Sequence, residues 1–365
     1  MTSNSAVSTS SSNIKLSCRR VWKVYGANPK SYFKGTGAVD DPSALAARMR
    51  AAGSMPAAMD VSFDVHVGET FVIMGLSGSG KSTVVRCLSR LVEPDFGSVE
   101  LDGEDLLSKS GRELIDIRRH KMGMVFQSFG LLPHLSVLEN IAFPLKLQGM
   151  SRAGQLERAS RVIELVGLTG RESAYPRQLS GGQQQRVGIA RSLAVEPQVW
   201  FLDEPFSALD PLIRRQMQDE FLRIQRVLRK SIVFITHDFL EALRIADRMA
   251  IMRDGRIVQI GTPEELILAP ADDYVAQFTS EVPLIKVLRA GQCCALVGDR
   301  PAGLPRVAQQ EKVEDLLVQL ASSPAGVDVF GDGDAYLGTL TSASLIQSLA
   351  AVQAEPNRYD GAHYA

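Results

Sequence analysis

The sequence predicts an α/β fold, because short apolar strands alternate with helices and a glycine-rich loop joins one such strand to the helix after it. Residues 71–74, 199–202 and 232–235 are apolar runs with the length and composition of buried parallel strands. Apolar residues at helical spacing follow the first run between Val84 and Leu91. Strands that alternate with helices indicate a parallel sheet covered by helices.

Length and composition bound the organisation of the chain. A length of 365 residues is typical of two domains. A hydrophobic share of 45%, a charged share of 22% and a net charge of -1 exclude collagen, coiled coil and extended disorder, and argue against a dedicated nucleic-acid binder. The 4 cysteines are too few for a disulfide scaffold and fit a reducing cytosol. No apolar run reaches the roughly 18 residues of a membrane span.

The first ordered elements lie near the N-terminus. Residues 1–13 are rich in serine and threonine and predict a disordered tail. Residues 14–25 alternate and predict a strand, as do residues 61–67. Between them, Asp41 is the expected N-cap of a short helix that has Pro42 at its first position.

The central part of the chain predicts a helical insertion and a hairpin. Residues 106–193 read mostly as helices, with charged and amide side chains on their solvent faces. Residues 249–252 and 257–260 flank Arg-Asp-Gly-Arg, a pattern typical of a β-hairpin. After about Ser280 the composition changes, which predicts a domain boundary.

A glycine-rich segment after the strand at 71–74 carries the clearest chemical signal. It reads Gly-Leu-Ser-Gly-Ser-Gly-Lys-Ser-Thr and matches G-x-x-x-x-G-K-[ST]. Glycines let successive backbone N–H groups point at phosphate oxygens, and the helix start adds the positive end of its dipole. The pattern predicts a P-loop NTPase core, with a flexible loop that happens to contain lysine as the alternative. The residues expected to bind the phosphates are Gly75, Ser77, Gly78, Ser79, Gly80, Lys81, Ser82 and Thr83.

The expected catalytic groups come from this loop and from a second strand. Lys81 is expected to neutralise the β- and γ-phosphates, and Ser82 to offer its hydroxyl to Mg²⁺. The strand at 199–202 ends in Asp203 and Glu204, whose side chains point to opposite sides. Asp203 therefore suits the Mg²⁺ shell and Glu204 suits polarising the attacking water. Acidic residues commonly end strands, so the pair alone is a weak signal. It indicates a catalytic site because the glycine-rich phosphate loop lies upstream of it.

A second anion site precedes another helix. Leu-Ser-Gly-Gly-Gln at 179–183 combines a hydroxyl, glycine N–H groups and a helix start. One chain does not easily wrap both sites around one phosphate, whereas a head-to-tail dimer closes each segment over the partner's loop. With these motifs in this order, residues 14–280 resemble the nucleotide-binding subunits of ABC transporters. The resemblance assigns nucleotide contacts to Ser180, Gly181, Gly182 and Gln183.

The resemblance implies further roles, with ATP and Mg²⁺ as cofactors. Gln127 resembles the Q-loop glutamine, which contacts metal and water and couples to the membrane subunit. His237 resembles the switch histidine, which bonds the γ-phosphate and steadies the catalytic Glu204. Asp210 ends a segment that resembles the D-loop of the dimer interface. Tyr25 stands where the family stacks an aromatic ring on adenine.

Longer runs resemble one branch of this family, the ATPases of glycine betaine/proline (quaternary amine) importers. They include a long segment at 26–59 and the run Phe-Ser-Ala-Leu-Asp-Pro-Leu-Ile at 206–213. Within the segment at 281–353, residues 313–349 predict a helix, two strands and a helix, an order that resembles one CBS module. Because the usual CBS unit is a tandem pair, a regulatory role and a purely structural or dimerising role both remain open. Residues 354–365 form a tail without an interpretation.

The resemblance implies an ATP-hydrolysing subunit that acts as a homodimer. It would lie peripherally on the cytoplasmic side of the inner membrane, against transmembrane permease subunits, and serve a periplasmic or surface substrate-binding protein. ATP-driven closure would move the helical subdomain at about 127–193. No nucleic-acid partner is expected. The alternatives are import of another solute, such as an amino acid or polyamine, and a non-transport ABC ATPase acting on DNA or ribosomes.

Overall fold

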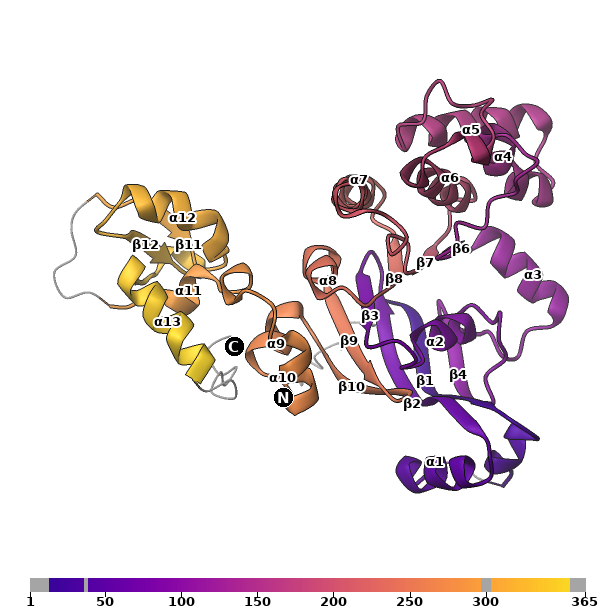
Figure 1. Ribbon diagram of the computed structural model, residues 1–365, viewed down its shortest axis with the longest axis horizontal. Coiled ribbons are helices and arrows are strands. Elements are labelled where there is room, and N and C mark those ends of the chain that lie inside the picture. Colours follow the sequence, from indigo (N-terminus) through magenta and orange to yellow (C-terminus); the bar gives the residue numbers. More distant parts are fainter. Residues whose placement is uncertain (1–12, 36–38, 297–302, 355–365) are drawn as a thin grey trace, which may run out of the picture. The chain divides into compact units, whose positions relative to one another are not determined.

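The computed structural model describes residues 13–35, 39–296 and 303–354. They form two compact units, one ending at Ile257 and the other beginning at Val258 (Figure 1). The tails predicted at 1–13 and 354–365 fall almost wholly outside the described residues. The domain boundary expected after about Ser280 stays a prediction.

A sheet whose strands belong to the first unit, except that its edge strand β10 (Arg256–Gly261) continues past Ile257, is parallel over most of its width. Its strand order is β10-β9-β3-β8-β7-β6, and the pairs from β9 to β6 are parallel. The strands are β3 (Thr70–Met74), β6 (Met122–Val125), β7 (Val199–Asp203), β8 (Ser231–Thr236), β9 (Arg248–Arg253) and β10 (Arg256–Gly261). Every residue of β3, β7 and β8 is buried, as their apolar sequences predict. The parallel α/β core predicted from the sequence is confirmed.

An antiparallel sheet in the same unit has the order β2-β1-β4-β5. Its strands are β1 (Ile14–Tyr25), β2 (Met55–His66), β4 (Phe96–Leu101) and β5 (Glu104–Asp105). β1 spans the residues predicted from the sequence. β2 begins earlier than the predicted strand at 61–67, because its first residues pair with the end of β1: Tyr25 lies opposite Met55.

Helices cover the parallel sheet and form a separate group. Figure 1 shows α4, α5 and α6 together, away from α2. Several helices begin with a reciprocal capping box, as at Ser110 with Glu113 and at Ser136 with Glu139. The helical elements are η1 (Pro29–Phe33), α1 (Pro42–Ala51), α2 (Lys81–Leu88), α3 (Gly111–His120), α4 (Val137–Leu147), α5 (Arg152–Leu165), η2 (Pro176–Gln178), α6 (Gly181–Ala194), α7 (Pro211–Leu228) and α8 (Phe239–Ile245).

The described residues of the segment at 26–59 pack onto the antiparallel sheet. Asp41 caps α1, and its side chain accepts hydrogen bonds from the backbone of Ser43 and Ala44, as the sequence predicts. Buried apolar residues of this segment and of β1 make one cluster: Trp22, Val24, Phe33, Val39, Leu45, Ala46, Met49 and Met59. This cluster fixes α1 beside the beginning of β2.

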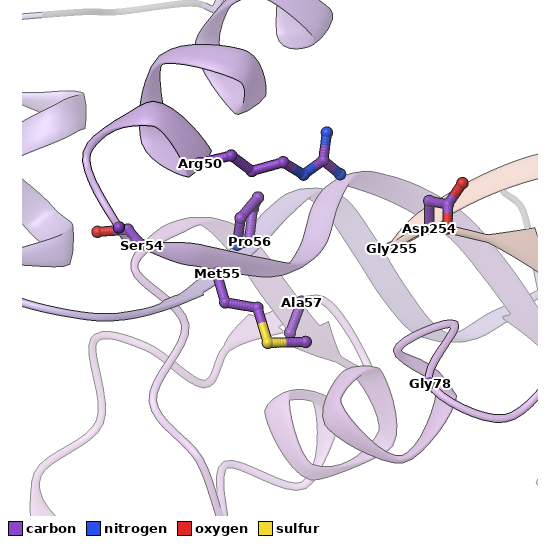
Figure 2. Close-up of a pocket in the computed structure, with 9 residues that line it drawn as sticks. Arg50, Ser54, Met55, Pro56, Ala57, Gly78, Asp254 and Gly255 are labelled. Atoms are coloured by element: carbon purple, nitrogen blue, oxygen red, sulfur yellow. The ribbon is translucent and has the colours of Figure 1, made fainter.

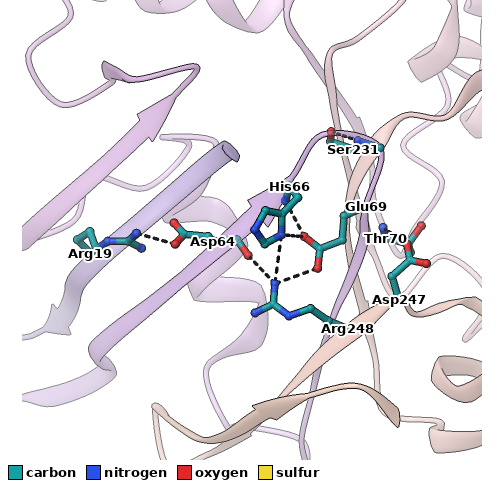
Figure 3. Close-up of polar contacts among 9 residues, drawn as sticks. Arg19, Asp64, His66, Glu69, Thr70, Ser231, Asp247 and Arg248 are labelled. Carbon is teal, nitrogen blue, oxygen red and sulfur yellow. Dashed lines mark hydrogen bonds and ion pairs between the residues drawn. The ribbon is translucent and has the colours of Figure 1, made fainter. Parts of the chain in front are cut away.

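A polar network fixes the turn between β2 and β3 (Figure 3). Glu69, which is 7% exposed, lies with Oε2 2.8 Å from Nδ1 of His66. Its Oε1 accepts a hydrogen bond of 3.0 Å from Nη1 of Arg248 on β9. The Arg248 guanidinium also lies over the Phe71 ring, 5.5 Å from its centroid. The network thus joins the start of β3 to its neighbour in the sheet.

Replacing Glu69 with alanine is expected to lower the free energy of unfolding by about 2–3 kcal/mol, because Arg248 loses a buried, hydrogen-bonded partner. Urea unfolding followed by circular dichroism measures the change. Glu157→Ala removes an ion pair whose carboxylate side chain is 65% exposed, and should cost no more than about 0.5 kcal/mol. Equal losses in the two variants would contradict this account of the network.

The second unit combines short helices with a small sheet of order β11-β12-β13. β11 pairs parallel to β12, and β12 pairs antiparallel to β13. The helix, strand, strand and helix predicted for residues 313–349 are confirmed, while β11 was not predicted; the CBS interpretation itself stays a prediction. The elements are α9 (Pro263–Leu268), α10 (Asp273–Thr279), η3 (Leu284–Lys286), α11 (Ala290–Cys293), β11 (Arg306–Ala308), α12 (Val313–Ser322), β12 (Val327–Phe330), η4 (Asp332–Asp334), β13 (Tyr336–Leu340) and α13 (Ser342–Ala354).

Candidate active site

The glycine-rich loop lies between the buried end of β3 and the start of α2. Two of its glycines have positive φ and no room for a side chain. A Cβ on Gly75 would lie 2.3 Å from the carbonyl oxygen of Met252, and one on Gly80 would lie 2.1 Å from that of Ala57. The loop is therefore held in its curled shape by backbone from β2 and β9.

Lys81 is 5% exposed at the first position of α2 and crosses back over the loop. Its Nζ donates hydrogen bonds to the carbonyl oxygens of Gly75 at 2.8 Å and Leu76 at 3.0 Å. Burial lowers the pKa of Lys81, while Glu204 and Asp203 act in the opposite direction. Ser79 contributes a buried Oγ without a hydrogen-bond partner in the described chain. A buried donor that lacks a protein partner fits a ligand oxygen in the loop.

Ser82 and Asp203 meet across the sheet. The Ser82 hydroxyl donates a hydrogen bond of 2.9 Å to Oδ1 of Asp203, at the end of β7. Asp203 is 5% exposed, and burial raises its pKa against the lowering effect of Ser82. A hydroxyl and a carboxylate at this spacing are ligands that Mg²⁺ prefers, together with phosphate oxygens.

Glu204 turns away from the strand that carries Asp203. Its backbone has a φ of 46°, and its N–H donates a hydrogen bond of 3.1 Å to the carbonyl oxygen of Ile235. Its Oε2 lies 3.2 Å from Nδ1 of His237 and accepts a hydrogen bond of 3.4 Å from Nε2 of Gln127. Three residues that are far apart in the sequence thus meet at one carboxylate oxygen.

Ser207 is a member of this cluster whose contacts the sequence did not predict. Its Oγ accepts a hydrogen bond of 3.3 Å from Gln127 and donates one of 3.0 Å to the carbonyl oxygen of Glu204. Below it, Phe206 packs against Phe234, with ring centroids 5.9 Å apart. The turn after β7 is therefore positioned by both the core and the cluster.

The predicted second anion site is well formed but lies apart from the loop. Ser180 and Gln183 make a capping box at the start of α6, and Gly181 is exposed. In the described ranges no hydrogen bond or ion pair joins this segment to the glycine-rich loop, and Figure 1 shows α6 in a different group from α2. Gly182 is buried, and a Cβ there would lie 2.7 Å from a methyl group of Ile213.

The remaining predicted residues lie at the edges of the site. Asp210 is exposed and caps α7, where its side chain accepts a hydrogen bond of 3.1 Å from the Ile213 backbone. Tyr25 is 45% exposed at the end of β1, and Nζ of Lys23 lies 5.7 Å from its ring centroid. Ser77 and Gly78 are exposed on the loop, and Thr83 is half-buried.

These residues fit a nucleoside triphosphate and a divalent cation. Among the described residues, no group of three or more His, Cys, Asp and Glu side chains could hold a metal by itself. A cation held by Ser82 and Asp203 would thus need ligand oxygens from the phosphates or from water.

Comparisons with known proteins agree with this geometry. The profile of the ABC transporter family matches residues 58–207. The trimethylamine N-oxide transport system ATP-binding protein of Ruegeria pomeroyi is 59% identical over 76% of this chain and 80% of its own length. The glycine betaine/proline betaine transport system ATP-binding protein of Salmonella typhimurium is 41% identical over 93% of this chain and 84% of its own.

A solved structure shares the fold. An ATP-binding cassette, solved as a dimer in a post-hydrolysis state bound to ADP and phosphate, is 30% identical with a TM-score of 0.56. The match covers 68% of this chain and 98% of that one. None of the helices described in the present chain is both long and apolar enough to traverse a lipid bilayer.

Proposed function

Because this chain belongs to the family of ABC transporter ATP-binding subunits, we propose that it hydrolyses ATP to drive uptake of a methylated amine of the glycine betaine and trimethylamine N-oxide class. The cluster around Glu204, beside the Ser82–Asp203 pair, carries the proposal for hydrolysis. The cargo is taken from the relatives, whose names specify trimethylamine N-oxide and glycine betaine transport.

The residues divide the chemistry of hydrolysis among them. The loop N–H groups and Lys81 would bind the phosphates, and Ser82 with Asp203 would hold Mg²⁺, which neutralises phosphate charge when it is bound. Glu204 would orient the attacking water and accept its proton. His237, 3.2 Å from the Glu204 carboxylate, would hold that carboxylate in place.

We also propose that two copies of the chain complete each site. The segment at Ser180–Gln183 has a preformed helix start, but within the described ranges no hydrogen bond or ion pair joins it to its own loop. The exposed hydroxyl of Ser180 and the N–H groups after it suit a phosphate presented by a partner chain. The dimer reported for the related cassette supports this arrangement.

An apolar groove in the first unit suits the permease. It has a volume of about 410 Å³ and lies between α3, β6, α4 and α6. Ile115, Phe126, Phe143 and Leu147 line it, and each is at least 37% exposed. Phe126 is followed by Gln127, which bonds Glu204 and Ser207. A permease helix in this groove would therefore touch the residue next to the catalytic cluster, and the subunit would lie peripherally on the membrane.

Placing a charge in this groove is expected to weaken permease binding at least about tenfold, because a carboxylate would lose water on docking. Phe143→Asp tests this by co-purification of the chain with its permease. Val227→Asp is the matched control, because Val227 is 67% exposed on α7, outside the groove. Equal permease recovery with both variants would mean that the partner docks elsewhere.

The cargo is tested with the assembled transporter. The chain and its permease are reconstituted, and ATP hydrolysis is measured with the substrate-binding protein loaded with glycine betaine, trimethylamine N-oxide, an amino acid or a polyamine. Stimulation by a methylated amine alone supports the proposal. Stimulation by an amino acid or polyamine instead would assign a different import function.

A further inference from the structure

A cavity of about 410 Å³ opens beside the glycine-rich loop (Figure 2). The segment at 26–59 contributes most of its wall, through the end of α1 and the first residues of β2. Gly78 of the loop and the β9–β10 turn close it. The lining residues are Arg50, Gly53, Ser54, Met55, Pro56, Ala57, Gly78, Asp254 and Gly255. A cavity of this size is within the usual range of small-molecule sites.

The cavity is continuous with the site proposed for the phosphates, because Gly78 belongs to both. Its shape is fixed by backbone contacts between distant segments. Gly255 N–H donates a hydrogen bond of 3.0 Å to the carbonyl oxygen of Ser79, and Met59 N–H donates one of 2.8 Å to that of Gly255. A ligand with phosphates in the loop would extend its remaining part into a preformed space.

Met55 links this cavity to the predicted base-stacking residue. Met55 and Tyr25 are direct cross-strand partners, so their side chains share one face of the sheet. Figure 2 shows the Met55 side chain on the side of β2 that faces Gly78. Gly26 fixes the junction, since a Cβ there would lie 2.5 Å from Oγ of Ser54. The thioether and the ring thereby offer adjoining apolar surface.

Arg50 and Asp254 supply the polar part of the cavity. Figure 2 shows Arg50 reaching from α1 toward the side where Asp254 lies. One guanidinium nitrogen of Arg50 is 3.9 Å from the sulfur of Met59, so the side chain lies along the buried cluster. A guanidinium, a carboxylate and an apolar thioether match a heteroaromatic base joined to a hydroxylated sugar.

We propose that residues 50–57 are part of the nucleotide site, and that Arg50 and Met55 bind the nucleoside portion of the nucleotide held by the loop. This inference rests on the proposed ATPase function and adds residues that the nucleotide motifs do not include. It gives these residues a role in affinity for the nucleoside.

The test compares two ligands that differ only by the nucleoside. Binding of Mg·ADP and of Mg·pyrophosphate to the full chain is measured by calorimetry. Arg50→Ala is expected to weaken ADP binding about five- to tenfold and to change pyrophosphate binding by less than about twofold. Arg48→Ala is the matched control, because it removes an exposed arginine from the same turn of α1 that does not line the cavity.

Met55→Ala tests the other wall, and it should also weaken ADP selectively because it removes apolar surface and adds no charge near the phosphates. The inference is overturned if Arg50→Ala and Arg48→Ala bind ADP equally, or if Arg50→Ala weakens ADP and pyrophosphate by the same factor. A wild-type chain that binds neither ligand would instead overturn the proposed ATPase function. Thermal unfolding of each variant establishes that α1 remains folded.

Discussion

A Glu204→Gln variant is expected to bind ATP, to accumulate as a closed dimer and to turn over at least about 100-fold more slowly than the wild type. Glutamine has nearly the same shape, so contacts at this position with Gln127 and His237 can be retained. Its amide cannot accept the proton of the attacking water. Single-turnover hydrolysis and size-exclusion chromatography with ATP measure the two effects.

One control variant and one variant of a neighbouring residue accompany this measurement. Glu113→Gln changes an exposed carboxylate in the capping box of α3, and it should leave hydrolysis unchanged. His237→Ala removes the group beside the carboxylate and should slow hydrolysis as well. Turnover of Glu204→Gln near the wild-type rate would mean that another group activates water.

Replacing Lys81 with alanine is expected to weaken ATP binding about 100-fold or more, because a buried cation that faces the phosphates is removed. The Lys81 Nζ already donates hydrogen bonds of 2.8 and 3.0 Å to two carbonyl oxygens of the loop. In this position it needs little rearrangement to meet the phosphate oxygens. Calorimetric titration with Mg·ATP gives the change in affinity.

The control for Lys81 is Lys146→Ala, which removes an exposed lysine from α4 and should not alter ATP affinity. Pyrophosphate separates this prediction from the one for Arg50. Lys81→Ala should weaken the binding of ADP and of pyrophosphate by similar factors, because the lysine acts on the phosphates. Selective loss of ADP in Lys81→Ala would contradict the role given to Lys81.

Much of the core could be predicted because its signals are local. The apolar strands, the loop between β3 and α2 and the β9–β10 hairpin are each contained within a few residues. The strand β6, at Met122–Val125, was wrongly included among the helices. A Cβ on its Gly123 would lie 2.8 Å from the Pro197 ring. Close packing against the segment after α6 requires glycine at this point of the strand.

The contacts of the site were harder to predict because they join distant segments. Gln127 and Glu204 are separated by 77 positions, yet their side chains are hydrogen-bonded. Their proximity follows from β6 and β7 being neighbours in the sheet, which requires knowledge of the strand order. Arg50 belongs to none of the sequence motifs. Only the packing of α1 beside β2 places it in the cavity beside the glycine-rich loop.

The backbone that packs against the glycine-rich loop has a consequence for the dynamics of this loop. Gly75 and Gly80 pack closely against the carbonyl oxygens of Met252 and Ala57. The carbonyl oxygen of Ser79 accepts a hydrogen bond from the Gly255 N–H. A segment held by strands from both ends of the unit cannot unfold by itself, since its opening would require the sheets to separate. The loop is therefore expected to keep its shape between cycles, ready for the next nucleotide without a cost of reordering.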